Sequence, residues 1–266
     1  MDIIHMLMRA TQPFRKTEFE IMKSEVFNQD CMEGMRELPD NFADLACVDP
    51  PYGIGEDGSK THGRTFRKDG THRLSIDNRT GRKSLIYNKY RSAGWDHKQP
   101  DQEYFNELFR VSKKVIIWGA NYINFDQKDT SSGLIFWDKV NGTNDFSDGE
   151  VAWTDLFSSV RKFEFMWNGM LQGKGAVSGK INQGDKSLCE TRIHPTQKPV
   201  QLYGWIYKNY LPEGGKVIDT HLGSGSNRIA ADKAGNIDFT GYEIDKEYFE
   251  KAERRYKDYK SQLRLF

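Results

Sequence analysis

Apolar runs and amphipathic stretches alternate along the chain, and they predict a regular succession of strands and helices. An apolar strand at 26–28 precedes a helix over 31–38, and a continuous apolar run over 43–48 is typical of a buried strand. The proline pair after this run prevents the strand from continuing. In chain order, the other predicted elements are a helix opening at Asp101, strands at 115–118, 134–137 and 163–167, a helix at 199–210, a strand at 216–218, a helix ending at Ala234, a strand at 238–242 and a charged helix at 246–260. This alternation indicates an α/β fold whose mostly parallel, twisted sheet carries helices on both faces.

Two long stretches lack such a pattern. Residues 53–98, called the basic flap below, contain eleven Lys and Arg against five Asp and Glu, which gives a net charge of +6. Residues 169–192 form a second stretch that bears many glycines and lysines. Long segments without periodicity in a compact domain are usually functional or mobile loops, so we expect both stretches to carry function.

The length of 266 residues suits one α/β domain with an insertion. We expect residues 1–21 to form an N-terminal arm without chemistry and residues 22–266 to form the domain. No apolar run reaches the roughly 18 to 20 residues that span a bilayer, which predicts a cytoplasmic protein without a membrane partner. The three cysteines lack CxxC spacing, which predicts reduced thiols and neither a disulfide framework nor a metal site.

A glycine turn near the carboxyl end has the pattern of a nucleotide-cofactor site. Asp219 ends a predicted strand, Gly223 and Gly225 open a helix, and Glu243 ends the next strand about 20 residues later. The glycines let the backbone approach a ligand, and a carboxylate at the second strand end can accept hydrogen bonds from ribose hydroxyls. Arg228 stands where the dinucleotide fingerprint needs a third glycine, and a tight turn alone would also explain two glycines.

The segment Asp49-Pro50-Pro51-Tyr52, at the carboxyl end of the strand over 43–48, is the most specific motif. The Asp49 carboxylate and the Pro50 carbonyl are suited to accept hydrogen bonds from both protons of an aromatic amine, which restores the nucleophilicity of its nitrogen. The prolines hold the carbonyl in place, and Tyr52 offers a face on which a flipped-out base can stack. Such stacking is worth roughly 1 to 3 kcal/mol, comparable with the cost of unstacking the base.

Together these motifs resemble those of the DNA amino-methyltransferase family in its β-type permuted order, in which the catalytic motif precedes the cofactor motif. The resemblance covers about residues 24 to 260. Its ordered matches are Asn28-Gln29-Asp30-Cys31-Met32, Asp49-Pro50-Pro51-Tyr52, Phe136-Trp137-Asp138-Lys139, His194-Pro195-Thr196-Gln197-Lys198-Pro199, the loop Asp219-Thr220-His221-Leu222-Gly223-Ser224-Gly225-Ser226, and Gly241-Tyr242-Glu243-Ile244-Asp245. It implies a Rossmann-like methyltransferase fold, S-adenosylmethionine as cofactor and N6 of adenine in double-stranded DNA as acceptor.

The same resemblance implies roles for individual residues. Asp30, next to Cys31, would bond the cofactor adenine, Thr196 and Lys198 would hold its methionine end, and Glu243 would hold the ribose. The pocket would be shaped by Asp219, His221, Gly223, Ser224, Gly225 and Ser226. The chain departs from the family pattern in this loop, because Thr220 and His221 stand where the family usually has Pro and Phe, and Ser226 where it has Thr. His221 can still stack on the cofactor, and Ser226 keeps a hydroxyl.

Several other activities fit less well. Members that methylate N4 of cytosine usually have Ser at the position of Asp49. C5-cytosine methylation needs a cysteine nucleophile, commonly in a Pro-Cys pair, and none of the three cysteines follows a proline. RNA remains open as an acceptor, whereas enzymes acting on protein glutamine resemble an Asn-headed motif. A NAD-dependent oxidoreductase would require the third glycine and would leave the Asp49 motif unexplained. A non-catalytic DNA-binding module stays open as an alternative, which binding assays with labelled S-adenosylmethionine and NAD would distinguish.

The distribution of charge predicts where DNA binds. We expect the basic flap, which would order only on DNA, and a target-recognition segment over 158–193 to form the DNA surface. The chain ends in Gln262-Leu263-Arg264-Leu265-Phe266, which resembles a short peptide that docks into the replication sliding clamp; packing of this tail on the terminal helix is the alternative. The sequence leaves a homodimer and the recognised DNA site open.

Overall fold

The computed structural model describes residues 23–56, 74–76, 83–85, 94–140, 147–168, 171–173 and 189–262. The expected N-terminal arm, most of the basic flap and the end of the tail lie outside these residues. The elements are β1 (Ser24–Phe27), α1 (Cys31–Glu37), β2 (Leu45–Val48), β3 (Leu74–Ile76), β4 (Lys83–Leu85), α2 (Gln102–Val111), β5 (Val115–Trp118), a 3-10 helix (Asp126–Thr130), β6 (Gly133–Asp138), β7 (Gly149–Thr154), β8 (Val160–Glu164), β9 (Met166–Asn168), β10 (Leu171–Gly173), α3 (Val200–Tyr210), β11 (Lys216–Asp219), α4 (Ser226–Ala234), β12 (Asp238–Tyr242) and α5 (Lys246–Gln262).

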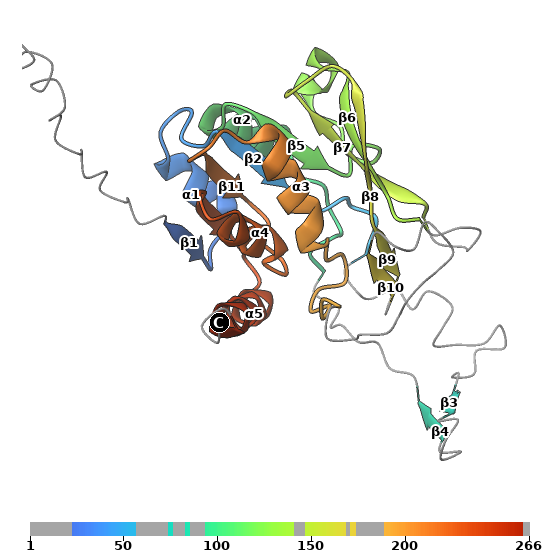
Figure 1. The fold of residues 1–266 in the computed structure, drawn as a ribbon. Helices are drawn as coiled ribbons and strands as arrows, with labels where there is room; N and C mark the ends of the chain where they lie inside the picture. The colour runs from blue at the N-terminus through green and yellow to red at the C-terminus, as the bar shows by residue number, and fades with distance from the viewer. Residues whose placement is uncertain are drawn as a thin grey trace, which may run out of the picture.

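A central sheet of eight strands in the order β1-β12-β11-β2-β5-β7-β6-β8 organises the described part of the chain (Figure 1). The first five strands of this order are parallel to one another. β7 runs antiparallel to both β5 and β6, and β8 is again parallel to β6. The prediction of an α/β fold with a mostly parallel sheet is therefore confirmed.

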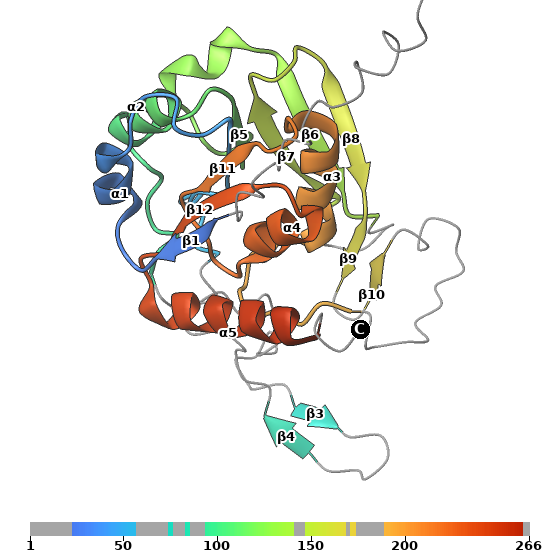
Figure 2. The same cartoon turned by 60° about the vertical axis from the view of Figure 1, so that its left-hand side comes forward.

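Helices cover both faces of the sheet because its central strands are apolar on both sides. In β2, Leu45 and Cys47 belong to one core cluster, with α3 and α4, whereas Ala46 and Val48 belong to the other, with α1 and α2. All four residues are at most 1% exposed. A parallel strand buried on both faces reads as a continuous apolar run, which is why the sequence showed no alternation here. Figure 2 shows α1 and α2 on one side of the sheet and α3 and α4 on the other.

Local sequence signals set the helix boundaries. The side chains of Asp30 and Asp101 accept hydrogen bonds from the first turns of α1 and α2, so each satisfies a backbone N–H that the helix leaves unpaired. Gly225 opens α4 in a left-handed conformation with φ of +71°, which glycine adopts without a Cβ clash. Most helices and strands accordingly begin and end within two residues of the positions that the sequence predicts.

Three expectations about local structure were wrong. The strand expected over 163–167 is two strands, β8 and β9, with Phe165 between them, because β8 pairs with β6 whereas β9 pairs with β10. Within the basic flap, β3 and β4 pair antiparallel, although segments of three residues are too short to show a period. β7 was not predicted at all, because a charged residue and a glycine at its start obscure its pattern. Among the helices within the described residues, none combines the length and apolar character needed to cross a membrane.

Candidate active site at the carboxyl edge of the sheet

Four of the acidic residues singled out in the sequence meet at one edge of the sheet. Because β1, β12, β11 and β2 are parallel, their carboxyl ends lie together. Asp219 ends β11, Asp49 and Glu243 directly follow β2 and β12, and Asp30 lies three residues beyond β1. Ligands of open α/β sheets bind in the crevice outside these strand ends. The fold therefore brings the predicted catalytic and cofactor motifs to the same edge.

The antiparallel strand β7 adds a carboxylate that sequence reasoning missed. Trp118, at the end of β5, pairs with Ala152 of β7, so the start of β7 lies beyond the carboxyl end of β5. Glu150 thereby reaches the same edge as Asp49. Lys139 follows the carboxyl end of β6, and its backbone N–H bonds to Asp148 beside the start of β7. An ionisable residue in an otherwise apolar strand segment was the available signal for Glu150.

Asp49 is held from two sides in a largely buried position. Its Oδ1 accepts a hydrogen bond of 2.5 Å from the Tyr52 hydroxyl, and its Oδ2 forms an ion pair with Lys198 Nζ. Lys198 Nζ also donates to the Tyr52 hydroxyl at 3.1 Å and lies 5.3 Å from the centre of the Trp118 ring. The Asp49 motif and the Lys198 motif, which the sequence separates by 146 residues, therefore form one structural unit.

The ammonium group of Lys198 joins two carboxylates. Besides Asp49, it contacts Glu150 Oε2 at 3.1 Å, and Glu150 Oε1 pairs with Lys139 Nζ at 2.5 Å. The Lys198 side chain is only 1% exposed, so its charge needs these partners. The resulting chain of two carboxylates and two ammonium groups has no net charge.

Burial and these partners set the protonation states of the network. Burial raises the pKa of Asp49, an effect that Lys198 opposes and Glu150 reinforces. Glu150 is also penalised by burial, but Lys198 and Lys139 lower its pKa to about 2. Burial disfavours the charge of Lys198, yet Asp49 and Glu150 raise its pKa above the ordinary value. Lys198 is thus an ammonium ion at neutral pH, and Glu150 is a carboxylate.

The ring of Tyr52 stacks on Tyr122, with 5.4 Å between the ring centres and 19° between the planes. Tyr122 is 44% exposed, so the ring face that a base would need is shared with a partly solvated side chain. On another side, Gly119 makes room for Tyr52, because a Cβ at this glycine would lie 2.2 Å from the Tyr52 ring. Gly119 also has φ of +79°, a conformation that favours glycine.

The turn after Tyr52 is tied to the residues that close the basic flap. Asp96 is 2% exposed, and its carboxylate accepts hydrogen bonds from the N–H groups of Gly53 and Glu56 at 2.8 and 2.7 Å. The Gln99 amide donates to the carbonyls of Tyr52 and Tyr122 at 3.0 and 2.8 Å. Both ends of the basic flap are therefore anchored beside the catalytic motif, and Asp96 is a further residue that the sequence did not single out.

In the predicted cofactor loop, Asp219 is 3% exposed, and both of its carboxylate oxygens accept hydrogen bonds. Its carboxylate accepts hydrogen bonds from the Asn227 amide at 2.9 Å and from the His221 N–H at 3.1 Å. Burial raises the pKa of Asp219 to about 7, despite these two donors. Burial also lowers the pKa of His221 to about 4, so its ring is neutral at pH 7 and bonds the Thr220 hydroxyl at 2.9 Å.

Glu243 closes the same loop from the end of β12. Its two oxygens accept hydrogen bonds from the N–H groups of Gly223 at 2.8 Å and Asp245 at 2.9 Å. Gly223 has φ of +51°, which turns its N–H toward this carboxylate. Asn28 donates to the Glu243 carbonyl at 2.7 Å and so links the end of β12 to the segment that leads to Asp30.

Asp30 caps α1, because its Oδ1 accepts from Met32 N–H at 2.8 Å, a role compatible with the second role expected of it. Burial and the neighbouring Asp30 carboxylate raise the pKa of the Cys31 thiol to about 12, which keeps it protonated. Thr196 contacts His194, whose ring lies between Trp95 and Tyr248 with ring centres 5.1 and 4.4 Å away. Burial lowers the pKa of His194 to about 3, so this aromatic wall is uncharged at neutral pH.

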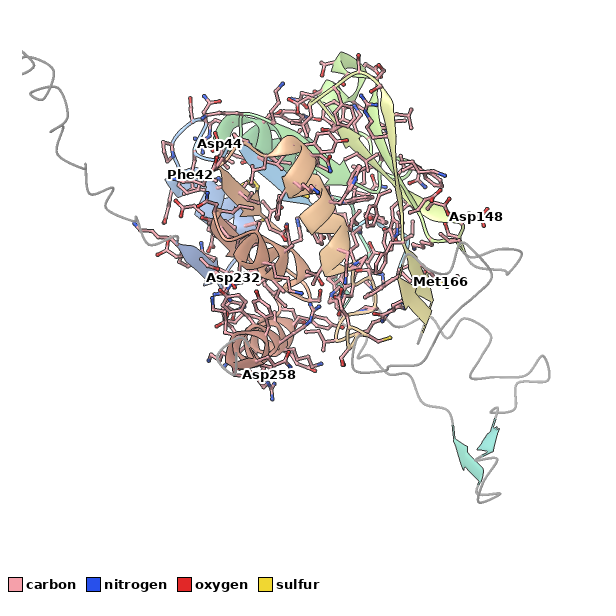
Figure 3. The ribbon with its side chains drawn as sticks, viewed as in Figure 1. Phe42, Asp44, Asp148, Met166, Asp232 and Asp258 are labelled. Carbon is pink, nitrogen blue, oxygen red and sulfur yellow. The ribbon has the colours of Figure 1, made fainter. Side chains whose placement is uncertain are left out.

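The hydroxyls of Ser224 and Ser226 bond each other at 3.0 Å and are held by α5. Arg255 donates to the Ser224 carbonyl and the Ser226 hydroxyl at 2.8 and 2.9 Å, and its other nitrogen pairs with Glu190 at 2.7 Å. The side chains on α5 also reach α4, where Tyr256 and Lys260 both bond Asp232, labelled in Figure 3. Helix α5 therefore supports the cofactor loop from outside.

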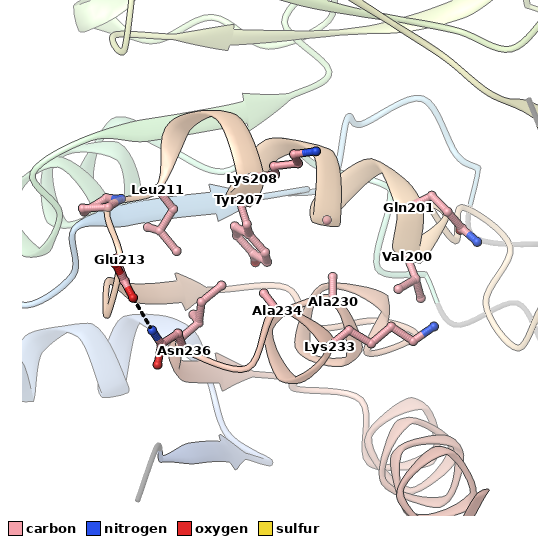
Figure 4. A pocket seen from close by; sticks show the side chains of 13 residues that line it. Val200, Gln201, Tyr207, Lys208, Leu211, Glu213, Ala230, Lys233, Ala234 and Asn236 are labelled. Carbon is pink, nitrogen blue, oxygen red and sulfur yellow. Dashed lines mark hydrogen bonds between the residues drawn. The ribbon is translucent and has the colours of Figure 1, made fainter. Parts of the chain in front are cut away.

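Two other possible sites do not compete with this edge. A groove between α3 and α4 is lined by residues such as Tyr207, Leu211 and Ala234 (Figure 4), and none of the acidic residues described above lines it. In the part of the chain that the structure describes, no three His, Cys, Asp or Glu side chains gather as ligands for a metal ion.

Comparison with known proteins gives an independent view of the chain. A model of the N6/N4 DNA methylase family matches residues 154–254. The type II methyltransferase M.HpaI of Haemophilus parainfluenzae is 25% identical over 88% of this chain and 74% of its own length. M2.MboI of Moraxella bovis, another type II methyltransferase, is 21% identical over 87% of this chain and 86% of its own length. These matches support the N6/N4 DNA methylase family. The segment matched to this methylase model contains the Lys198 motif, the cofactor loop and Glu243, whereas the Asp49 motif precedes it.

Among solved structures, M1.HpyAVI in complex with S-adenosylmethionine is similar to this chain, with 19% identity, a TM-score of 0.48, and coverage of 87% of this chain and 98% of the other.

Proposed function

We propose that this chain transfers a methyl group from S-adenosylmethionine to the N6 amine of an adenine flipped out of double-stranded DNA. The observation that carries the proposal is the position of Asp49, ion-paired with Lys198 at the sheet edge that also holds Asp219 and Glu243. A base-binding motif and a cofactor loop at one edge allow donor and acceptor to meet, and the match to the N6/N4 DNA methylases supports a methyl donor there.

The residues at the loop fit this cofactor chemically. Carboxylates suit a positively charged sulfur and ribose hydroxyls, and Glu243, which follows β12, has a carboxylate that can accept hydrogen bonds from two ribose hydroxyls. Gly223 and Gly225 are in the left-handed conformation and have no side chains, so the backbone next to Glu243 is open to a ligand. We propose that Glu243 holds the ribose, Asp30 with Cys31 the adenine, and Thr196 and Lys198 the methionine end. Asp219, His221, Ser224 and Ser226 would shape the pocket.

When bound, S-adenosylmethionine would supply an electrophilic methyl group: the bond from the methyl carbon to sulfur would break as the bond to the amine nitrogen forms, and the sulfur would leave as a neutral thioether. The proton that the amine nitrogen loses would pass to the Asp49 carboxylate or to solvent. Asp49 and the Pro50 carbonyl accept hydrogen bonds from the two amine protons and so direct the nitrogen lone pair toward the methyl group. Pro50 and Pro51 keep the carbonyl in place. Tyr52 stacks on the base in the position that Tyr122 occupies in the free protein, and this stacking offsets part of the cost of extrusion.

Adenine is preferred over cytosine because Asp49 stands where N4-cytosine enzymes of the resembling family usually have Ser. Long-read sequencing of DNA from a host that expresses the chain distinguishes N6-methyladenine from N4-methylcytosine and gives the recognised site. N4-methylcytosine, or modification confined to RNA, would contradict the proposal.

Paired variants test the division of roles. Asp49→Ala should abolish transfer to duplex DNA and leave S-adenosylmethionine affinity nearly unchanged in calorimetry, because Asp49 faces the acceptor. Glu243→Ala should instead weaken cofactor binding. Near wild-type turnover of Asp49→Ala would show that the catalytic role lies elsewhere.

DNA recognition and partners complete the proposal. We propose that the basic flap and the segment 158–193, whose described part includes β8, β9 and β10, contact DNA, and that the segment 158–193 reads the bases.

We further propose that the tail 262–266 binds the sliding clamp. Helix α5 ends at Gln262, and residues 263–266 lie outside the described structure. Purified clamp should bind the full chain and not a chain lacking 262–266, and equal binding of both would exclude this role.

A further inference from the structure

Glu150 occupies a position that the strand geometry determines tightly. It is the second residue of β7 and pairs in register with Trp137 of β6. The residue before it must be small, because a Cβ on Gly149 would lie 2.3 Å from the Phe136 ring and 2.4 Å from the Trp137 carbonyl. The antiparallel direction of β7 then brings Glu150 to the edge where Asp49 lies.

At that edge Glu150 accepts one of the hydrogen bonds that the Lys198 ammonium group can donate. The ammonium group contacts Asp49, the Tyr52 hydroxyl and Glu150, which occupies its three N–H donors in this structure. When Lys198 holds the methionine end of the cofactor, as proposed above, one of these three contacts would be exchanged. Lys139 neutralises the second oxygen of Glu150 at 2.5 Å. If Glu150 carried no charge, Lys198 would have Asp49 as its only carboxylate partner among the contacts described here.

We propose that Glu150 is a positioning residue for methyl transfer: it holds Lys198 between two carboxylates, so that Lys198 orients Asp49 and Tyr52 without withdrawing Asp49 from the acceptor amine. This inference rests on the proposed function. A carboxylate bound by a fully committed ammonium ion is a weaker acceptor for the amine protons, and sharing the ammonium group with Glu150 preserves the acceptor strength of Asp49.

The charges around Asp49 make the inference testable through pH. Asp49 interacts electrostatically with titratable groups from every element packed around it: Lys198 and Tyr203 from α3 and the segment before it, Glu150 from β7, Asp219 from β11, Tyr104 from α2, and Cys47 and Tyr52 from its own segment. Of these, Lys198 lowers the pKa of Asp49 and Glu150 raises it. Removing either charge should therefore shift the titration of Asp49, in opposite directions.

The experiment measures the single-turnover rate of adenine methylation against pH, with saturating cofactor and duplex DNA. In Glu150→Gln, the acid limb should move to lower pH, because the negative charge that raises the pKa of Asp49 is gone. The plateau rate should fall about tenfold, as is common for groups that orient a reacting residue. In Lys198→Met, the acid limb should move to higher pH. Cofactor affinity of Glu150→Gln should stay at the wild-type value.

Two further variants guard against a purely structural effect. Glu107→Gln removes a comparably exposed carboxylate, 21% against 25%, from an ion pair with Arg110 on α2, and it should change neither rate nor pH profile. Glu150→Asp keeps the charge but shortens the side chain, so its acid limb should stay in place while its rate falls.

Three other results would contradict the positioning role of Glu150 or the proposed function. A wild-type rate and profile in Glu150→Gln would overturn the inference. A lower rate with an unmoved acid limb and a lower melting temperature would also overturn it, because Glu150 would then only stabilise the fold. A wild-type protein that methylates no adenine would instead refute the proposed function itself.

Discussion

At the scale of single residues, the candidate site depends on backbone that leaves space for side chains. Gly119 follows β5 with φ of +79°, and the Tyr52 ring fills the volume where its Cβ would lie. We predict that Gly119→Ala lowers turnover by about 100-fold, because a displacement of about 1 Å at a reacting group can cost that much. Methylation of duplex DNA by the purified variant measures this effect.

The matched control is Gly235→Ala. Gly235 has φ of +81°, but nothing lies within 4 Å of its Cβ position. Both variants should lose thermal stability through backbone strain, and Gly119→Ala should lose more because its Cβ also overlaps the Tyr52 ring. If Gly235→Ala loses activity to the same extent, the effect of Gly119 on Tyr52 is not specific.

Asp219 should make stability depend on pH. Burial raises its folded-state pKa to about 7, above the ordinary value of 3.8, so the folded state retains a proton that the unfolded state releases. This contribution is present below the unfolded pKa and is lost as pH rises toward the folded pKa. We predict that Asp219→Asn gains melting temperature relative to the wild type between pH 5 and pH 8. A difference between the two proteins that is equal at both pH values would contradict a raised pKa.

At the scale of elements, α5 holds the proposed cofactor loop in place through one arginine. Arg255 bonds Ser224, Ser226 and Glu190, and the paired side chains of Arg255 and Glu190 are only 14% and 13% exposed. We predict that Arg255→Met costs about 1.5 to 3 kcal/mol of unfolding free energy, the usual range for charged hydrogen bonds, and weakens cofactor binding. Urea unfolding and calorimetry measure the two effects.

Arg254 on the same helix is exposed, so Arg254→Met should change neither quantity. Unchanged cofactor affinity in Arg255→Met would mean that the loop keeps its shape without α5.

At the scale of the whole molecule, charge is distributed unevenly in a protein whose net charge is only +1. We predict that DNA affinity falls steeply with salt and that replacing Arg79, Arg82 and Lys89 of the basic flap by Ala reduces this dependence. Each lost phosphate contact should reduce the slope of log K against log salt by about 0.9. Fluorescence anisotropy over a salt titration measures it.

The same loss of charge on α5, through Ala at the exposed Lys246, Arg254 and Lys257, should leave the slope unchanged. Equal slopes for the two triple variants would show that the basic flap has no particular part in binding DNA.

Local sequence patterns are enough to predict the class of fold and the strand ends at which carboxylates occur. Strands and helices that bury their apolar residues show a recognisable local pattern in the sequence. In a parallel sheet the carboxyl ends of all strands lie at one edge. Asp49, Asp219 and Glu243 were therefore predictable as neighbours without any tertiary information. The cap at Asp30 and the left-handed Gly225 likewise follow from neighbouring residues alone.

Which charges meet at that edge depends on how the elements pack in three dimensions. Lys198 pairs with Asp49, 149 positions away by their numbers. Because β7 runs antiparallel to β5, Glu150 near the start of β7 lies at the same edge and also pairs with Lys198. Arg255 reaches Ser226 from a helix whose own pattern shows only a charged surface. A local pattern records how one element is buried and not which element packs beside it, so long-range ion pairs and the direction of a strand become visible only when the chain has folded.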